Sequence, residues 1–298
     1  MTRRALLGAA LVAGLALGAF GCGGAGTPRP DLLLVSTRDN DYAIYELNAD
    51  GGRQRRLTDQ DADPENLFFQ VEPAWSPDAT RIAFSSRRGA SFDVYAMNAD
   101  GTGTERLTST KENDSHPTWS PSGASIAFAR EGDIYVMSSD GSGARRVSDP
   151  TAEEVEPAWS PDGRRIAYVR RTPGTLVREL WLMRANGAER RKITSFGRAI
   201  YGPTWSPDGR RIAFSADLDG SIFQIYSIGV DGRGFRRHTQ SAADAFEPSW
   251  SPDGTTIAFS REGAIVTVDP EGSVQEITDP VDNDSSPAWN PRPPEEGD

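Results

Sequence analysis

The sequence predicts an all-β protein, a six-bladed β-propeller whose blades are four-stranded antiparallel sheets. One observation is a motif at residues 157–163, Pro-Ala-Trp-Ser-Pro-Asp-Gly, of which full or partial copies surround Trp75, Trp119, Trp205, Trp250 and Trp289. Successive tryptophans of this motif are 44, 40, 46, 45 and 39 residues apart, and such a period indicates a repeat architecture. A second observation is that the two ends of the chain hold complementary parts of one repeat.

Each repeat contains four expected strands in a fixed order, as the copy in the middle of the chain illustrates. The tryptophan strand ends in a Ser-Pro-Asp-Gly turn at 160–163, where Pro presets φ and Gly accepts a positive φ. The second strand is the apolar run at 166–168. The third is an alternating strand at 180–183, which ends in the Asn-Gly turn at 186–187. A short edge strand at 192–194 closes the unit, which matches a propeller blade.

The N-terminal repeat lacks a tryptophan strand, and the C-terminal repeat contains nothing else. Residues 31–58 hold three expected strands, whereas only a short tail follows Trp289. We therefore expect the C-terminal strand to join the N-terminal blade and close the ring, which hides the edges that an open sheet exposes. The expected blades, within one domain at 31–291, are 31–59 plus 283–291, 66–109, 112–149, 152–195, 199–241 and 244–279.

The N-terminus predicts export and lipid anchoring. The basic pair Arg3 and Arg4 precedes an apolar stretch that is short for a membrane span and typical of a signal peptide, here over 1–21. The following Ala-Phe-Gly-Cys resembles the lipobox of bacterial lipoproteins, so Cys22, the single cysteine, is the expected lipidation site of a tether over 22–30. An ordinary cleaved signal peptide with a stray cysteine is the alternative. The basic pair also resembles a twin-arginine signal, which leaves the export route open.

The chain is acidic, with a formal net charge of −11, and cleavage after the signal peptide leaves 30 basic against 43 acidic residues. Because such a protein repels nucleic acid and anionic headgroups, we expect no nucleic-acid partner. The sequence predicts a monomeric cell-envelope protein, in the periplasm or on the outer face of the cytoplasmic membrane. The Pro- and Glu-rich residues 292–298 predict a disordered tail.

The repeat, Pro-x-Trp-Ser-Pro-Asp-Gly-x-x-Ile-Ala-Phe, resembles that of TolB-type propellers and of the propellers that precede the catalytic domain of prolyl-oligopeptidase-like peptidases. The resemblance covers residues 31–291. TolB carries an additional N-terminal domain and the peptidases a further α/β-hydrolase domain, and this sequence contains neither. The resemblance therefore implies the fold and the binding of partners, and not an identity with TolB.

Acidic residues concentrate in the loops that enter the tryptophan strands. These loops vary between repeats, so a binding site is expected on their rim of the propeller. The glutamates that precede the motif proline recur in alternate blades, and converging carboxylates repel one another unless a cation joins them. This arrangement predicts a channel mouth that binds a divalent cation such as calcium or an Arg- or Lys-bearing segment of a partner. The alternative is that each carboxylate pairs with a neighbouring arginine or is solvated. The candidate binding residues are Glu72, His116, Glu156, Glu247, Asp114 and Asp284.

A second calcium candidate has weaker support. Its three aspartates have the opening spacing of a calcium loop, but Pro and Gln stand where an EF-hand needs Gly and Glu. They are Asp59, Asp61 and Asp63. The chain has two histidines, His116 and His238, too few for a histidine-built metal centre.

The favoured function is a non-catalytic, membrane-anchored module that binds an envelope protein or peptide at the acidic channel mouth and requires no cofactor. A carbohydrate-active enzyme, either a glycosidase or a lyase, is one alternative, because two channel carboxylates at a suitable separation would suffice. A ligand-sensing propeller is another. Four aromatic residues of the variable rim are open candidates for partner contact: Phe68, Phe69, Tyr201 and Phe246.

Overall fold

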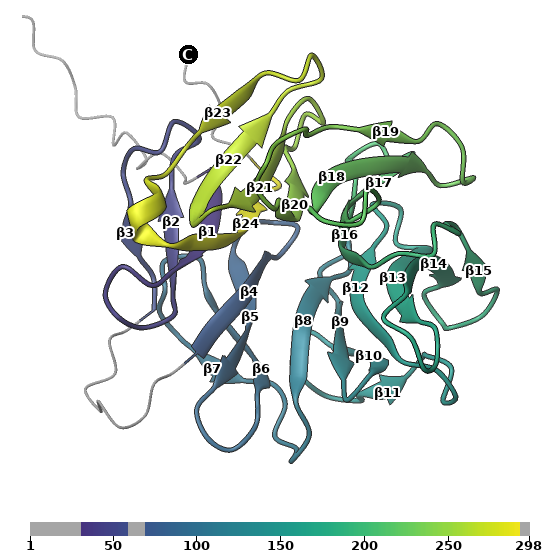
Figure 1. The fold of residues 1–298 in the computed structure, drawn as a ribbon. Coiled ribbons are helices and arrows are strands. Elements are labelled where there is room, and N and C mark those ends of the chain that lie inside the picture. The colour runs from purple at the N-terminus through teal and green to yellow at the C-terminus, as the bar shows by residue number, and fades with distance from the viewer. Residues whose placement is uncertain (1–30, 59–68, 293–298) are drawn as a thin grey trace, which may run out of the picture.

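The computed structural model describes residues 31–58 and 69–292 and shows a six-bladed β-propeller (Figure 1). Six four-stranded antiparallel sheets stand in a ring, each running from a long inner strand to a short outer one, so the predicted fold class is confirmed. Several predictions lie outside the described residues: the signal peptide, Cys22 and its tether, the loop with Asp59, Asp61 and Asp63, Phe68, and the tail from residue 293. No helix within the described ranges is long and apolar enough to cross a membrane.

The four strands of each blade follow one another from the axis of the propeller outwards. Blade 1 contains, in this order, β24 (Asp284–Trp289), β1 (Leu32–Ser36), β2 (Ala43–Leu47) and β3 (Arg55–Arg56). Blade 2 contains β4 (Phe69–Trp75), β5 (Arg81–Arg87), β6 (Asp93–Asn98) and β7 (Glu105–Arg106). Blade 3 contains β8 (Asp114–Trp119), β9 (Ser125–Arg130), β10 (Asp133–Ser138) and β11 (Arg145–Arg146).

The remaining three blades repeat this order. Blade 4 contains β12 (Glu154–Trp159), β13 (Arg165–Arg171), β14 (Arg178–Arg184) and β15 (Arg191–Lys192). Blade 5 contains β16 (Ile200–Trp205), β17 (Arg211–Ala216), β18 (Gln224–Gly229) and β19 (Arg236–Arg237). Blade 6 contains β20 (Phe246–Trp250), β21 (Ile257–Arg261), β22 (Ala264–Val268) and β23 (Val274–Glu276), and the short 3₁₀ helix η1 (Pro280–Asp282) leads from it to β24.

The ring closes as predicted, because the C-terminal strand β24 pairs antiparallel with β1. Leu32 lies opposite Trp289 and Leu33 opposite Ala288. The backbone N–H of Asn290 donates to the carbonyl of Asp31 at 2.8 Å, which extends the pairing by one further hydrogen bond. The two ends of the described chain are therefore held in one sheet.

The hydrophobic core is a ring of six clusters, each of which joins two neighbouring blades. Trp119 of blade 3, for example, packs with Ala83 and Val94 of blade 2. Its indole N–H also donates to the carbonyl of Ala74 at 3.2 Å, and Trp205 makes the equivalent bond to blade 4. These two bonds help to fix blade 3 against blade 2 and blade 5 against blade 4.

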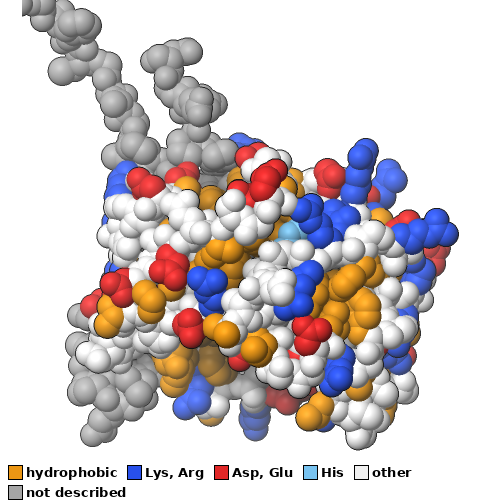
Figure 2. Space-filling model, turned by 45° about the horizontal axis from the view of Figure 1, so that its top comes forward, with side chains coloured by type: hydrophobic (Ala, Val, Ile, Leu, Met, Phe, Trp, Pro, Cys, Tyr) orange, Lys and Arg blue, Asp and Glu red, His pale blue; other side chains and the backbone are white. Residues whose placement is uncertain are grey.

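The outer edges are short and charged. Five of the six outer strands have two residues and the sixth has three, and most of these residues are exposed Arg, Lys or Glu. Short charged edges discourage pairing with another sheet. On the face shown in Figure 2, basic and acidic side chains are interspersed, with hydrophobic side chains in the hollows between them.

Candidate functional site

Every inner strand carries an irregularity at the residue before the motif proline. The pairing register of each inner strand with its neighbour shifts there, as at a β-bulge. A positive φ is uncommon for a residue other than glycine and costs about 1–3 kcal/mol, so the surrounding blade must enforce it. The φ values are 57° at Glu72, 53° at His116, 54° at Glu156, 59° at Gly202, 56° at Glu247 and 52° at Ser286.

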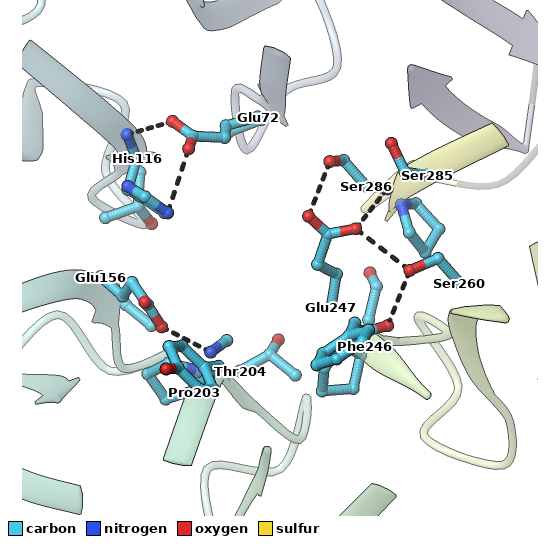
Figure 3. Close-up of a pocket in the computed structure, with 18 of the residues that line it drawn as sticks. Glu72, His116, Glu156, Pro203, Thr204, Phe246, Glu247, Ser260, Ser285 and Ser286 are labelled. Atoms are coloured by element: carbon cyan, nitrogen blue, oxygen red, sulfur yellow. Dashed lines mark hydrogen bonds and ion pairs between the residues drawn. The ribbon is translucent and has the colours of Figure 1, made fainter. Parts of the chain in front are cut away.

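These bulges line a cavity of about 800 Å³ on the axis of the propeller (Figure 3). All six inner strands contribute to its wall, and the six motif prolines make much of the wall apolar. Three aromatic side chains line it as well, Tyr201, Phe223 and Phe246. Phe223, in the loop before β18, carries no signal in the sequence that marks it as part of the cavity.

The three glutamates of the cavity form the same hydrogen bond in three places. In each case an Oε2 atom accepts the backbone N–H of the equivalent bulge residue in the next blade. These bonds join blade 2 to 3, blade 4 to 5 and blade 6 to 1. The pairs are Glu72 with His116 (2.6 Å), Glu156 with Gly202 (2.6 Å) and Glu247 with Ser286 (2.8 Å).

Glu72 and His116 form a pair at the wall of the cavity. Glu72 Oε1 lies 3.0 Å from Nε2 of the His116 ring, and Oε2 also accepts the Ser85 hydroxyl at 2.8 Å. The other ring nitrogen of His116 lies 3.1 Å from the Ser115 hydroxyl. The contacts with Glu72 and Ser115 hold the His116 imidazole in one orientation, and Ser115 itself is not among the residues that line the cavity.

Glu156 is the most buried of the three glutamates, with 9 % of its surface exposed. Burial raises its pKa, and the nearby His116 ring, the Gly202 N–H and the Arg178 guanidinium oppose that rise. Arg178 lies 3.6 Å from Glu156 Oε1, and its guanidinium also lies over the Tyr201 ring at 4.8 Å. A residue of the chain itself thus supplies the positive charge that this carboxylate needs.

Glu156→Gln is expected to stabilise the fold at neutral pH. Because burial raises the folded-state pKa of Glu156 above its ordinary value of 4.5, the stability that its protonation contributes is present below that value and is lost as the pH rises through the folded pKa. Gln keeps an acceptor for the Gly202 N–H and does not ionise. The difference in melting temperature, variant minus wild type, should grow as the pH is raised from about 4.5 to neutral. A difference that stays constant over this range would contradict the assignment.

Glu247 differs from the other two because its partners are neutral. Its Oε2 accepts the Ser286 N–H and the Ser260 hydroxyl, at 2.8 and 3.2 Å, and its Oε1 accepts the Ser286 hydroxyl at 3.1 Å. It forms no ion pair with any residue in the described ranges, unlike Glu72 and Glu156. Figure 3 shows this carboxylate between the two serines.

The prediction that Asp114 and Asp284 belong to the channel mouth needs correction. Both are buried, and neither lines the axial cavity, although Asp284 lines a smaller hollow that adjoins it. Asp114 accepts two bonds from the Arg130 guanidinium, at 2.6 and 2.8 Å, and Asp284 accepts two from Arg38. These aspartates are structural ion pairs, which is the pairing alternative that the sequence left open.

Metal binding has limited support in the part of the chain that the structure describes. No group of three or more His, Cys, Asp or Glu side chains is placed there to hold a metal ion. A divalent cation at the channel mouth therefore stays a prediction. Of the aromatic candidates, Tyr201 and Phe246 line the cavity, whereas Phe69 packs between Tyr42 and Phe92 at the rim of blades 1 and 2.

The protein is a closed six-bladed β-propeller. Its axial cavity is large enough for a ligand and lies where the six inner strands meet. The model of the TolB beta propeller domain family matches residues 25–132, 67–177 and 153–293, and the chain belongs to this family.

Individual relatives cover parts of the chain. An uncharacterized protein of Agrobacterium fabrum is 32% identical over 30% of this chain and 29% of its own length. The Tol-Pal system protein TolB of Geobacter sulfurreducens is 36% identical over 28% of this chain and 18% of its own length. The chain thus matches less than a third of either relative. Among solved structures, TolB from Acinetobacter baumannii superposes with a TM-score of 0.75 at 21% identity, over 87% of this chain and 66% of that one, which is a likeness of fold.

Proposed function

We propose that the protein is an exported, membrane-anchored and non-catalytic propeller that binds a segment of another envelope protein. The binding face is the cavity wall that carries Glu72, Glu156 and Glu247. The observation that carries the proposal is the axial cavity, whose volume lies in the range of ligand sites. Its wall combines six prolines and three aromatic side chains with serines, threonines, one histidine and three glutamates, and this mixture of apolar surface and hydrogen-bonding groups suits a peptide segment.

Two further points support this function. The family includes relatives named as the TolB protein of a Tol-Pal system. We take the proposed class of partner, an envelope protein, from these relatives. Each cavity glutamate accepts a backbone N–H of the next blade, so these carboxylates are held in place as fixed acceptors. Anchoring rests on the lipobox-like sequence at Cys22, which lies outside the described residues.

The proposal predicts the outcome of crosslinking in intact cells followed by mass spectrometry. Wild type should capture an envelope protein, and replacing Glu72, Glu156 and Glu247 together by Gln should lower the capture at least about tenfold at low salt. A matched control replaces three surface glutamates by Gln and so changes the net charge by the same amount as the cavity variant does. They are Glu105, Glu189 and Glu276. The control should capture as wild type does.

Other outcomes would overturn parts of the proposal. Equal capture by the triple cavity variant and by wild type would reject this face. The opposite rim would replace it, where arginines follow the Ser-Pro-Asp-Gly turns: Arg164, Arg165, Arg210 and Arg211. Turnover of a defined glycan by the pure protein, abolished by Glu156→Gln, would establish the carbohydrate-active enzyme instead. In the same cells, unchanged membrane fractionation of a Cys22→Ser variant would reject lipid anchoring.

A further inference from the structure

We infer that the part of the cavity at Glu247 is a subsite for a cationic side chain, the guanidinium of an arginine or the ammonium of a lysine in the bound segment. This inference rests on the proposed function and names the chemistry that the site selects. It comes from comparing three positions that the repeat makes equivalent.

The three cavity glutamates stand at the same motif position in alternate blades and differ in their positive partners. Glu72 faces the His116 ring at 3.0 Å, and Glu156 faces Arg178 at 3.6 Å. Glu247 makes hydrogen bonds to serines alone within the described residues. Two of the three carboxylates thus receive a basic partner from the chain, and the third is available to a cation from outside.

The serines hold the Glu247 carboxylate in one orientation without neutralising it. A carboxylate has about four lone-pair positions, and the Ser286 N–H and the hydroxyls of Ser286 and Ser260 use three. One position remains on Oε1, which accepts a single bond. Because prolines and aromatic side chains make part of the cavity wall, a fixed negative charge there attracts a cation more strongly than it would in water.

Aromatic rings stand beside this carboxylate. Phe246 precedes Glu247 in β20, and its ring centroid lies 4.9 Å from that of Phe223, which in turn lies 5.6 Å from Tyr201. A cation near an aromatic face gains about 0.5–2 kcal/mol. The chain already shows this arrangement beside the cavity, where Arg178 lies over Tyr201 and pairs with Glu156. The subsite would repeat it with a cation from the partner.

A second hollow gives the bound segment a route to the rim. Its volume is about 420 Å³, and it shares Phe246, Ser260 and Ser285 with the axial cavity. From there it continues outwards between blade 6 and the C-terminal strand, past Gly263 and Asn283. A peptide that places its basic side chain against Glu247 can therefore leave the axis along this hollow.

The test titrates the full mature chain with two capped tripeptides, acetyl-Gly-Arg-Gly-amide and its citrulline analogue, by ligand-observed NMR. Citrulline keeps the shape of arginine and removes the charge. We expect the arginine peptide to bind with a Kd on the order of 1 mM and the citrulline peptide to bind at least about tenfold more weakly. Glu247→Gln should remove this difference, whereas the surface control Glu105→Gln should keep it.

Three results would overturn the subsite: equal affinity for the two peptides, a preference for arginine that survives in Glu247→Gln, or no arginine binding up to about 20 mM. The crosslinking experiment separates this inference from the proposed function. If wild type and Glu247→Gln capture an envelope protein equally, the function stands and the subsite is wrong. If arginine binding depends on Glu247 but no protein is captured, the subsite stands and the partner class is wrong.

Discussion

A chain that lacks residues 283–298 is expected to be unfolded, or to melt far below the full mature chain. The deletion removes β24, the inner strand of blade 1, and leaves β1 with an unpaired edge on the axis. Leu32 and Leu33 of β1, each no more than 1% exposed, lose the cover of Trp289 and Ala288. The blade 1 to blade 6 interface loses Trp289 as well.

The expected size follows from what the deletion breaks. Arg38 loses the Asp284 carboxylate, which lies 2.9 Å away and whose side chain is fully buried, and breaking a buried ion pair costs about 3–5 kcal/mol. Exposing an apolar side chain adds about 1.5–3 kcal/mol for each that is fully uncovered. Since a typical domain has only about 5–15 kcal/mol in total, the loss is comparable with the whole stability.

Thermal unfolding followed by circular dichroism measures this effect. The matched control is a chain that lacks residues 293–298, a deletion that removes none of the contacts described above, and it should melt as the full chain does. A melting temperature of the longer deletion within a few degrees of that control would contradict closure by β24. Loss of the cooperative transition is the result we expect.

The fold could be predicted almost entirely because its signals are local and repeated. Each copy of the motif places a tryptophan, a turn and an apolar run at nearly the same spacing, so six weak patterns support one another. The closure also followed from the sequence, since one end lacks the strand that the other end supplies. The positive φ at the six bulges was not predicted and is seen only in the structure. Glycine is the residue whose presence indicates a positive φ, and five of these six residues are not glycine.

The site could be predicted only in part, because those bulges decide which side chains face the axis. Glu72 and Asp114 both lie in inner strands, β4 and β8, yet one lines the cavity and the other is buried beside an arginine. A spacing in the sequence separates them: the buried acids Asp114 and Glu154 each have an arginine 16 residues later, Arg130 and Arg170. The cavity acids Glu72 and Glu247 instead have a serine 13 residues later.

The acids of the predicted channel mouth should therefore divide into two groups when they are mutated. Asp114→Ala is expected to lower the free energy of unfolding by roughly 3–5 kcal/mol, because it leaves the Arg130 guanidinium, only 15% exposed, without its carboxylate. The hydrogen bond to Asp114 also raises the pKa of Arg130, and an arginine stays charged even when its partner is removed. At about 2–4 °C for each 1 kcal/mol, the melting temperature should fall by roughly 6–20 °C.

Glu247→Gln is the matched control for this prediction, since it removes one negative charge from an acid that has only neutral partners. Its free energy of unfolding should fall by no more than about 1 kcal/mol, because the Gln amide can still form hydrogen bonds with the serines. Its preference for the arginine peptide over the citrulline peptide should be lost. Replacing Asp114 and Arg130 together by Leu tests the cause, because removal of a whole buried pair costs less than removal of one partner. If Asp114→Ala were as stable as wild type, the ion pair would contribute nothing to the fold.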